Sequence, residues 1–283
     1  MFNLDHIIWL VLSIAGIALL TFFSVKKKWS FKKVAIIVAI IALASETFKI
    51  ATHVFPCYRK DFLGEGAKVS GFEGAMYLLP KSLPFHLCSM LIFFVFFLAL
   101  SKNEKLIEKV KTFCVPIFIF AGILALVINT AFDGDIHNFE SFTGCIEDLN
   151  AYKASKDALD LSSYLATLSA YQYFPYHAAI LWFGLYTMIT KQVKFGFKEW
   201  LRNDLILYAL FICAIWMNSI TIKFSTNFMF VVCPPAKGLP LLNLNHGWHV
   251  YIIHYMLIAA ICTFLFQLPF MIKEWKAKKA LKK

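Results

Sequence analysis

The chain alternates long apolar segments with short polar connections, and the polar residues inside the apolar segments gather at one end of each. Seven such segments can be recognised, at residues 5–24, 34–55, 83–100, 110–131, 173–191, 203–224 and 248–271. At a rise of about 1.5 Å per residue, each segment with its flanks is long enough to cross a hydrocarbon core of ~30 Å. The pattern therefore predicts an all-α fold: a polytopic membrane bundle of seven transmembrane helices, forming one domain over residues 1–283.

Alternate threading of these segments brings their polar ends to a common depth. From the second segment to the seventh, the polar residues all fall in the same half of the membrane. They are Glu46, Lys49, His53, His86, Cys88, Ser89, Asn129, Thr130, Asp133, His177, Asn218, Thr221, Lys223, Trp248, His249, Tyr251 and His254. Because ionisable groups are costly to bury in lipid, this gathering predicts a shared polar cavity.

Composition and charge support a membrane protein and set its orientation. The apolar fraction is 60 %, whereas soluble domains average ~45–50 %. Nineteen of the 28 Lys and Arg residues lie at 26–33, 102–111, 191–202 and 273–283, which are alternate connections and the C-terminal tail. By the positive-inside rule these are cytoplasmic, so the N-terminus is predicted outside, the C-terminus inside and the cavity toward the outer leaflet of the cell membrane. The net charge of +11 is then explained by topology and attraction to anionic lipid, not by nucleic-acid binding.

The outer connections carry two further features. The longest, at about 133–172, mixes acidic and aromatic residues, which favours short helices lying on the outer surface as a lid. Cys57, Cys145 and Cys233 lie in the three outer connections. A disulfide between two of them and three unpaired thiols are both compatible with the sequence.

Two sets of residues in the polar halves could carry chemistry. Glu46 and Lys49 are spaced i, i+3 and can form an ion pair, either to fix helix packing or as part of a binding site. Cys88 would need an imidazole within reach to act as a nucleophile. His177 opens the fifth segment at a similar depth and is the better partner, since His86 shares a helix with Cys88 but faces elsewhere. The alternative is that Cys88 is a small buried apolar residue.

Other polar residues allow less specific interpretations. Histidines from different helices at one depth could hold Zn²⁺, but none are paired at metal-ligand spacing on one helix, so no metal ligand and no cofactor is assigned. Asn218 and Asn227 are either hydrogen-bond anchors between helices or oxyanion donors. Trp248 is either an interfacial anchor or part of the cavity.

Three short motifs resemble a known family. LPFHLC at 83–88, STNFMF at 225–230 and WHVYI at 248–252 are similar to motifs of the YwaF family of bacterial integral membrane proteins. That family has animal relatives that include a phospholipid-remodelling membrane acyltransferase working through a Cys and a His. The resemblance implies a lipid-directed acyl-transfer site, with His177 matching the family's His in a later span.

Three functions follow from these observations. The leading hypothesis is acyl transfer or acyl hydrolysis on membrane phospholipids, with Cys88 as nucleophile and His177 or His86 as base. The second is a receptor or transporter that binds a small polar or anionic solute, and the third is a metal-dependent lipid hydrolase. Substrate-binding residues are expected among Glu46, Lys49, Asn129, Asn218, Asn227, Trp248, His249 and Tyr251.

Overall fold

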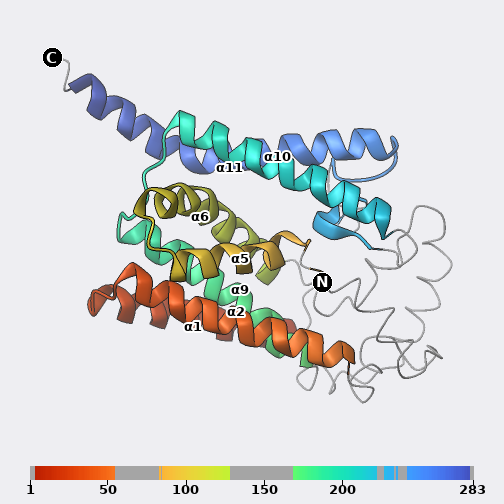
Figure 1. Cartoon of the computed structure of the whole chain (residues 1–283), viewed down its shortest axis with the longest axis horizontal. Coiled ribbons are helices and arrows are strands. Elements are labelled where there is room, and N and C mark those ends of the chain that lie inside the picture. The colour runs from red at the N-terminus through yellow and green to blue at the C-terminus, as the bar shows by residue number, and fades with distance from the viewer. Residues whose placement is uncertain are drawn as a thin grey trace.

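The computed structural model of the chain describes residues 4–54, 83, 85–127, 168–221, 226–232, 234 and 241–280. These residues form helices and connecting turns, with no strand among them. The helices are α1 (Leu4–Lys26), α2 (Phe31–Val54), α5 (Leu87–Leu100), α6 (Glu104–Val127), α9 (Leu168–Ile189), α10 (Phe197–Ile220) and α11 (Trp248–Ala280), with a 3₁₀ turn, η4 (Phe228–Phe230), before α11 (Figure 1). The predicted all-α class is confirmed, and each of the seven apolar segments coincides with one helix.

Four of the described helices are long and apolar enough to cross a membrane by length and composition. They are α1, α6, α10 and α11, and α5 is a shorter apolar helix. The outer surfaces of α1, α10 and α11 expose large apolar side chains, including Leu19, Trp216 and Ile261. Such surfaces are unfavourable in water and suit contact with lipid. The number of spans and their orientation remain predictions.

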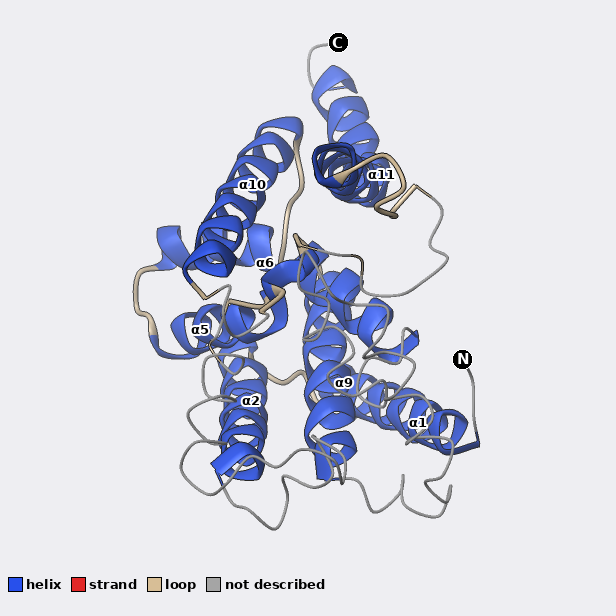
Figure 2. Cartoon of the chain, turned by 90° about the vertical axis from the view of Figure 1, so that its right-hand side faces the viewer, coloured by secondary structure: helices blue, strands red, loops and turns tan. Residues whose placement is uncertain are grey.

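Helix α9 lies at the centre of the larger part of the bundle. It packs against α1, α2 and α6, and α5 packs against α2 and α6. Its Phe174, Trp182 and Tyr186 are among the largest side chains that are fully buried. Figure 2 shows α10 and α11 on the other side of α5 and α6 from α1, α2 and α9. The molecule thus has a tightly packed five-helix part and a helix pair beside it.

Two glycines let α6 and α9 approach closely. A Cβ atom on Gly122 of α6 would lie 2.7 Å from Leu181 Cβ and 3.1 Å from the carbonyl oxygen of His177. On α9, a Cβ atom on Gly184 would lie 2.7 Å from Ile119 Cγ1. Since real Cβ contacts are longer than this, only glycine permits the observed spacing. Gly122 therefore fixes the distance between α6 and the turn of α9 that carries His177.

A proline in α6 explains how α10 is attached. Pro116 has no N–H, so the carbonyl of Thr112, four residues earlier, loses its normal helical donor. The Nδ2 amide of Asn203 on α10 donates to that carbonyl oxygen at 2.8 Å. The guanidinium of Arg202 donates to Thr112 Oγ1 at 2.6 Å. A backbone group that would otherwise be unsatisfied in an apolar interior is thus the docking point for α10.

Candidate functional site

Cys88 lies in the first turn of α5. His86 stands at the N-cap position with extended backbone angles, and its side chain makes no capping hydrogen bond. The first hydrogen bond of the helix is donated by Met90 N to His86 O, at 2.9 Å. The N–H groups of the first turn have no acceptor within a helix, and they form the positive end of its dipole. The thiol of Cys88 is therefore next to a helix N-terminus that the His86 side chain does not cap, and it is half-buried.

A partly buried ion pair from α2 lies against this turn. Lys49 Nζ is 2.6 Å from Glu46 Oε1, and each side chain is 20 % exposed. The predicted Glu46–Lys49 pair is thus confirmed. Lys49 Nζ also donates to Ser89 Oγ, the residue after Cys88, at 3.5 Å. This contact brings the ammonium group to the turn of α5 that carries Cys88.

His177 is held by the turn of α9 that precedes it. Its Nδ1 is 2.7 Å from the carbonyl oxygen of Tyr173. Because a carbonyl only accepts, Nδ1 must carry the proton, and Nε2 of the neutral ring keeps its lone pair. The ring packs on Tyr173 at 4.2 Å and on Tyr176 at 5.2 Å between centroids. The side chain therefore has a fixed position and the tautomer that a general base at Nε2 requires.

Tyr176 connects α9 to α5. Its hydroxyl donates to the carbonyl oxygen of Cys88. This hydrogen bond joins Tyr176, the residue before His177, to the backbone of Cys88. Within the part of the chain that the structure describes, no hydrogen bond joins Cys88 Sγ to His177. We call the residues Glu46, Lys49, Cys88, Ser89, Tyr176 and His177 the thiol cluster.

A second group of predicted residues anchors the segment before α11. The Asn218 amide on α10 donates through Nδ2 to Phe228 O at 3.1 Å and accepts from Phe228 N through Oδ1 at 2.8 Å. Asn227 Oδ1 accepts from Val232 N at 3.0 Å. Both side chains are thus engaged with backbone groups, which favours the anchor role for these amides.

Two α11 residues complete this anchoring. Trp248 Nε1 donates to Val231 O at 2.8 Å, and the Tyr251 hydroxyl donates to Phe230 O. Inside η4, Met229 has φ 53° and ψ 18°. A left-handed conformation is unfavourable for a residue with a Cβ, so it persists only where surrounding contacts impose it. The hydrogen bonds from α10 and α11 supply that constraint.

The anchored segment is where the three sequence motifs meet. The rings of Phe228 and Phe230 each lie 5.5 Å from the His86 ring, and Phe228 lies 5.5 Å from Phe85. His86 therefore sits in an aromatic environment built from the second motif. The third motif holds that segment through Trp248 and Tyr251. Residues far apart in the sequence thus converge at the N-terminus of α5.

Other predicted residues lie apart from this region. His249 is exposed, and His254 Nδ1 is 3.0 Å from Leu241 O. Among the described residues, no group of three or more His, Cys, Asp and Glu side chains is arranged to hold a metal ion. Asn129, residues 133–167 of the predicted lid, Cys57, Cys145, Cys233 and the His53 side chain lie outside the described residues. Residues 168–172 of that predicted loop form the start of α9.

Sequence reasoning missed several residues that position this chemistry. Tyr173 and Tyr176 were not singled out, because tyrosines near span ends are usually interfacial anchors. Asn203, Asp204, Thr263 and Gln267 form a polar group between α6, α10 and α11 that also had not been predicted. The sequence signal that could have identified Asp204 is its carboxylate just inside an apolar segment. Because Arg202 is two residues away, the pair resembles the charged residues that commonly border a transmembrane helix.

Comparison with known proteins gives a family for the chain. The model of the TMEM164 family matches residues 1–267, which is nearly the whole chain and includes all three motifs. No curated protein and no solved structure matches significantly. The match confirms the coarser prediction, a membrane-protein family over nearly the whole chain, but not the resemblance to the YwaF family or its relation to an acyltransferase.

Proposed function

Because the chain belongs to the TMEM164 family of membrane proteins, we propose that it is a multi-pass protein of the cell membrane that acts on phospholipid acyl chains. Cys88 is the nucleophile in this proposal and His177 is the base. The observation that carries the proposal is the thiol cluster, in which hydrogen bonds link the turn of the half-buried Cys88 thiol to the partly buried Lys49 ammonium and to the residue before His177. The resemblance to the YwaF family, with its acyltransferase relatives, supports the same chemistry.

The cluster contains the groups that acyl transfer requires. As Cys88 Sγ attacks the ester carbonyl of a phospholipid, His177 Nε2 accepts the thiol proton. The carbonyl oxygen becomes negative, and in this proposal the N–H groups at the start of α5 and the ammonium of Lys49 stabilise it. The C–O ester bond then breaks, and His177 returns the proton to the leaving hydroxyl of the lysophospholipid.

The second half of the reaction uses the same groups. The hydroxyl of another lysophospholipid attacks the thioester, its proton passes to His177, and the Cys88 thiol is regenerated. Water in place of this hydroxyl gives hydrolysis. Catalytic hydrogen bonds often form only when substrate is bound. In this proposal, substrate binding brings Cys88 Sγ to His177 Nε2.

Topology is part of this proposal. The basic connections at 26–33, 102–111 and 191–202 and the basic C-terminal tail place the N-terminus outside and the C-terminus in the cytoplasm. The thiol cluster then lies in the outer half of the membrane. Lipids would enter it from the side between apolar helices, without leaving the bilayer.

The test is acyl exchange by the purified full-length protein in lipid nanodiscs, with a phospholipid donor and an isotopically labelled lysophospholipid. Cys88→Ala and His177→Asn should lower the rate by about 10²-fold or more. Cys262→Ala removes a thiol of similar exposure on α11 and serves as the matched control. Wild-type exchange in Cys88→Ala would rule out the covalent mechanism.

The same preparation distinguishes the two alternatives. If no lipid is converted but a polar or anionic solute binds saturably, and Lys49→Met abolishes that binding, the protein is a receptor or transporter. If lipid is hydrolysed and a chelator stops the reaction, the metal-dependent hydrolase is favoured.

A further inference from the structure

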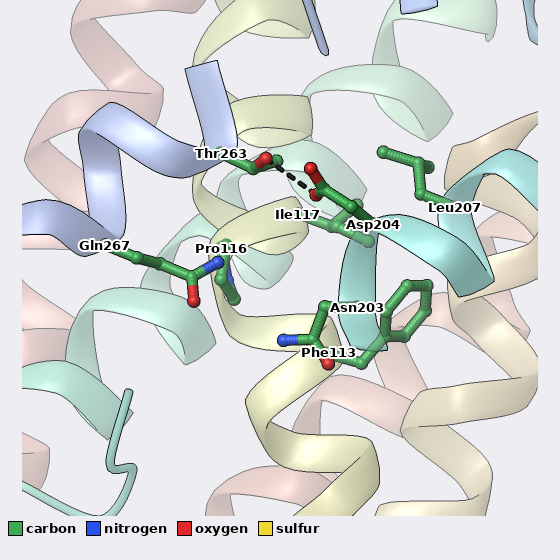
Figure 3. A pocket seen from close by; sticks show the side chains of 8 residues that line it. All are labelled: Phe113, Pro116, Ile117, Asn203, Asp204, Leu207, Thr263 and Gln267. Carbon is green, nitrogen blue, oxygen red and sulfur yellow. Dashed lines mark hydrogen bonds between the residues drawn. The ribbon is translucent and has the colours of Figure 1, made fainter. Parts of the chain in front are cut away.

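A second polar site lies where α10 and α11 meet the middle of α6 (Figure 3). Gly122, which contacts His177, lies further along the same helix. It is a cavity of about 10 Å³, lined by Asn203 and Asp204 of α10, Thr263 and Gln267 of α11, and Phe113 and Pro116 of α6. This volume is about the room that one water molecule needs. A lipid or an organic solute does not fit.

Asp204 brings a carboxylate into this cavity without a matching positive charge. The side chain is 4 % exposed. Its Oδ1 accepts from Thr263 Oγ1 at 2.7 Å, whereas Oδ2 has no hydrogen-bond partner. In the described part of the chain, the ion pairs are Lys49–Glu46 and Lys111–Glu108, so none involves Asp204. A buried carboxylate is costly unless a positive charge accompanies it.

Gln267 adds an unsatisfied amide to the same cavity. The side chain is 1 % exposed, and neither Oε1 nor Nε2 has a hydrogen-bond partner. Figure 3 shows the amide directed into the space beside Pro116, and the Asp204 carboxylate directed toward Thr263. A half-turn about the last side-chain bond exchanges the oxygen and nitrogen of the amide. Gln267 can therefore present its oxygen to the cavity whichever of the two atoms occupies that position in the structure. Two oxygen acceptors on two helices are thus available.

We propose that this cavity binds a small monovalent cation of the size of Na⁺, coordinated by Asp204 Oδ2 and Gln267 Oε1. Oxygen donors suit a hard cation, and a single carboxylate matches a single positive charge. Ca²⁺ takes 6–8 oxygen ligands and Mg²⁺ usually keeps several waters, so neither suits a cavity of this size with one carboxylate. Zn²⁺ sites are built mainly from Cys and His, which the cavity does not contain.

Such an ion would join α10 to α11. Asp204 lies on α10 and Gln267 on α11, so the cation bridges the two helices beside Pro116, close to the point where α10 is attached to α6. The stability of the helix pair then depends on the ion, by mass action.

The test uses the purified full-length protein with NaCl replaced stepwise by choline chloride at constant ionic strength. We expect saturable binding of one ²²Na⁺ per chain, and a melting temperature about 3 °C higher in saturating Na⁺ than in choline. Asp204→Asn should abolish both effects. Glu199→Gln removes a partly exposed carboxylate from the first turn of the same helix and should change neither.

A second variant keeps the test decisive if Asp204→Asn fails to fold. Gln267→Leu removes one oxygen ligand and an unsatisfied amide, so it should fold and bind ²²Na⁺ about tenfold more weakly. Absence of ²²Na⁺ binding by the wild-type protein, with equal melting temperatures in Na⁺, K⁺ and choline, would overturn the proposal. The cavity would then hold only water, or Asp204 would hold a proton.

Discussion

Replacing Asn218 by leucine tests how the segment before α11 is held. Asn218 is 5 % exposed and satisfies both the N–H and the carbonyl of Phe228, which is fully buried. Leucine has the same branched shape and the same number of heavy atoms, but no polar atoms. The substitution therefore leaves two backbone groups unsatisfied in a buried position, without creating a large cavity.

The expected loss follows from these two groups. Each buried backbone group left unpaired costs about 1–3 kcal/mol, so the two together should lower the free energy of unfolding by about 2–6 kcal/mol. For a chain of this size, 1 kcal/mol corresponds to about 2–4 °C, so the melting temperature should fall by about 4–24 °C. His86 should also become more mobile, because Phe228 and Phe230 pack against it.

The measurement is thermal unfolding of the detergent-purified protein, followed by circular dichroism of its helices. Ser219→Ala is the matched control, because Ser219 is the next residue on α10, is exposed and bonds only to the carbonyl of Ile215 in its own helix. A melting temperature of Asn218→Leu within 1 °C of this control would refute the anchoring role.

Three further predictions concern packing, docking and topology. Gly122→Ala should lower the melting temperature by about 2–10 °C, because the added methyl group forces α6 away from α9. Gly16→Ala is the control and should not change it, since a Cβ atom there has nothing within 4 Å. Equal melting temperatures of the two variants would argue against the close approach of α6 and α9. Asn203→Leu should lower the free energy of unfolding by about 1–3 kcal/mol, because the Thr112 carbonyl loses its hydrogen-bond donor. Pro116→Ala restores the helical donor, so in a double-mutant cycle it should remove most of that loss. Additive losses would contradict the role of Asn203 in attaching α10. Single cysteines introduced near 105, 196 and 278 should react with an impermeant maleimide only from the cytoplasm, and those near 70, 150 and 237 only from outside; labelling of the C-terminal tail from outside would reverse the proposed orientation.

The sequence predicts the helices well because apolar length is a strong signal. It predicts their ends less well, since hydrophobicity marks the apolar stretch and not the helix. Helix α6 begins at Glu104, ahead of the predicted 110, and α11 continues to Ala280, beyond 271. The additional residues are mostly charged or small residues of good helix propensity, so the helix continues after the apolar stretch ends.

The sequence predicts how deep in the membrane the candidate site residues lie, but not toward which side of its helix each side chain points. Shared depth groups Lys49, Cys88 and His177, and in the structure Lys49 bonds to the residue after Cys88 while the residue before His177 bonds to the Cys88 carbonyl. It also included His249, which is exposed, although Tyr251 two residues later is buried. Successive residues of a helix differ by about 100° in direction, so depth does not decide which side chains point inward. That depends on packing between helices, for example through Gly122, which a single sequence does not reveal.

The proposed covalent mechanism is tested most directly by mass spectrometry of the intact protein after brief incubation with a phospholipid carrying a labelled acyl chain. We predict an added acyl group on Cys88, removed by neutral hydroxylamine as expected for a thioester, and absent from Cys88→Ala. It should also fall strongly in His177→Asn, because that variant lacks the base at Nε2. An unmodified Cys88 in wild-type protein that is actively exchanging acyl chains would contradict the mechanism.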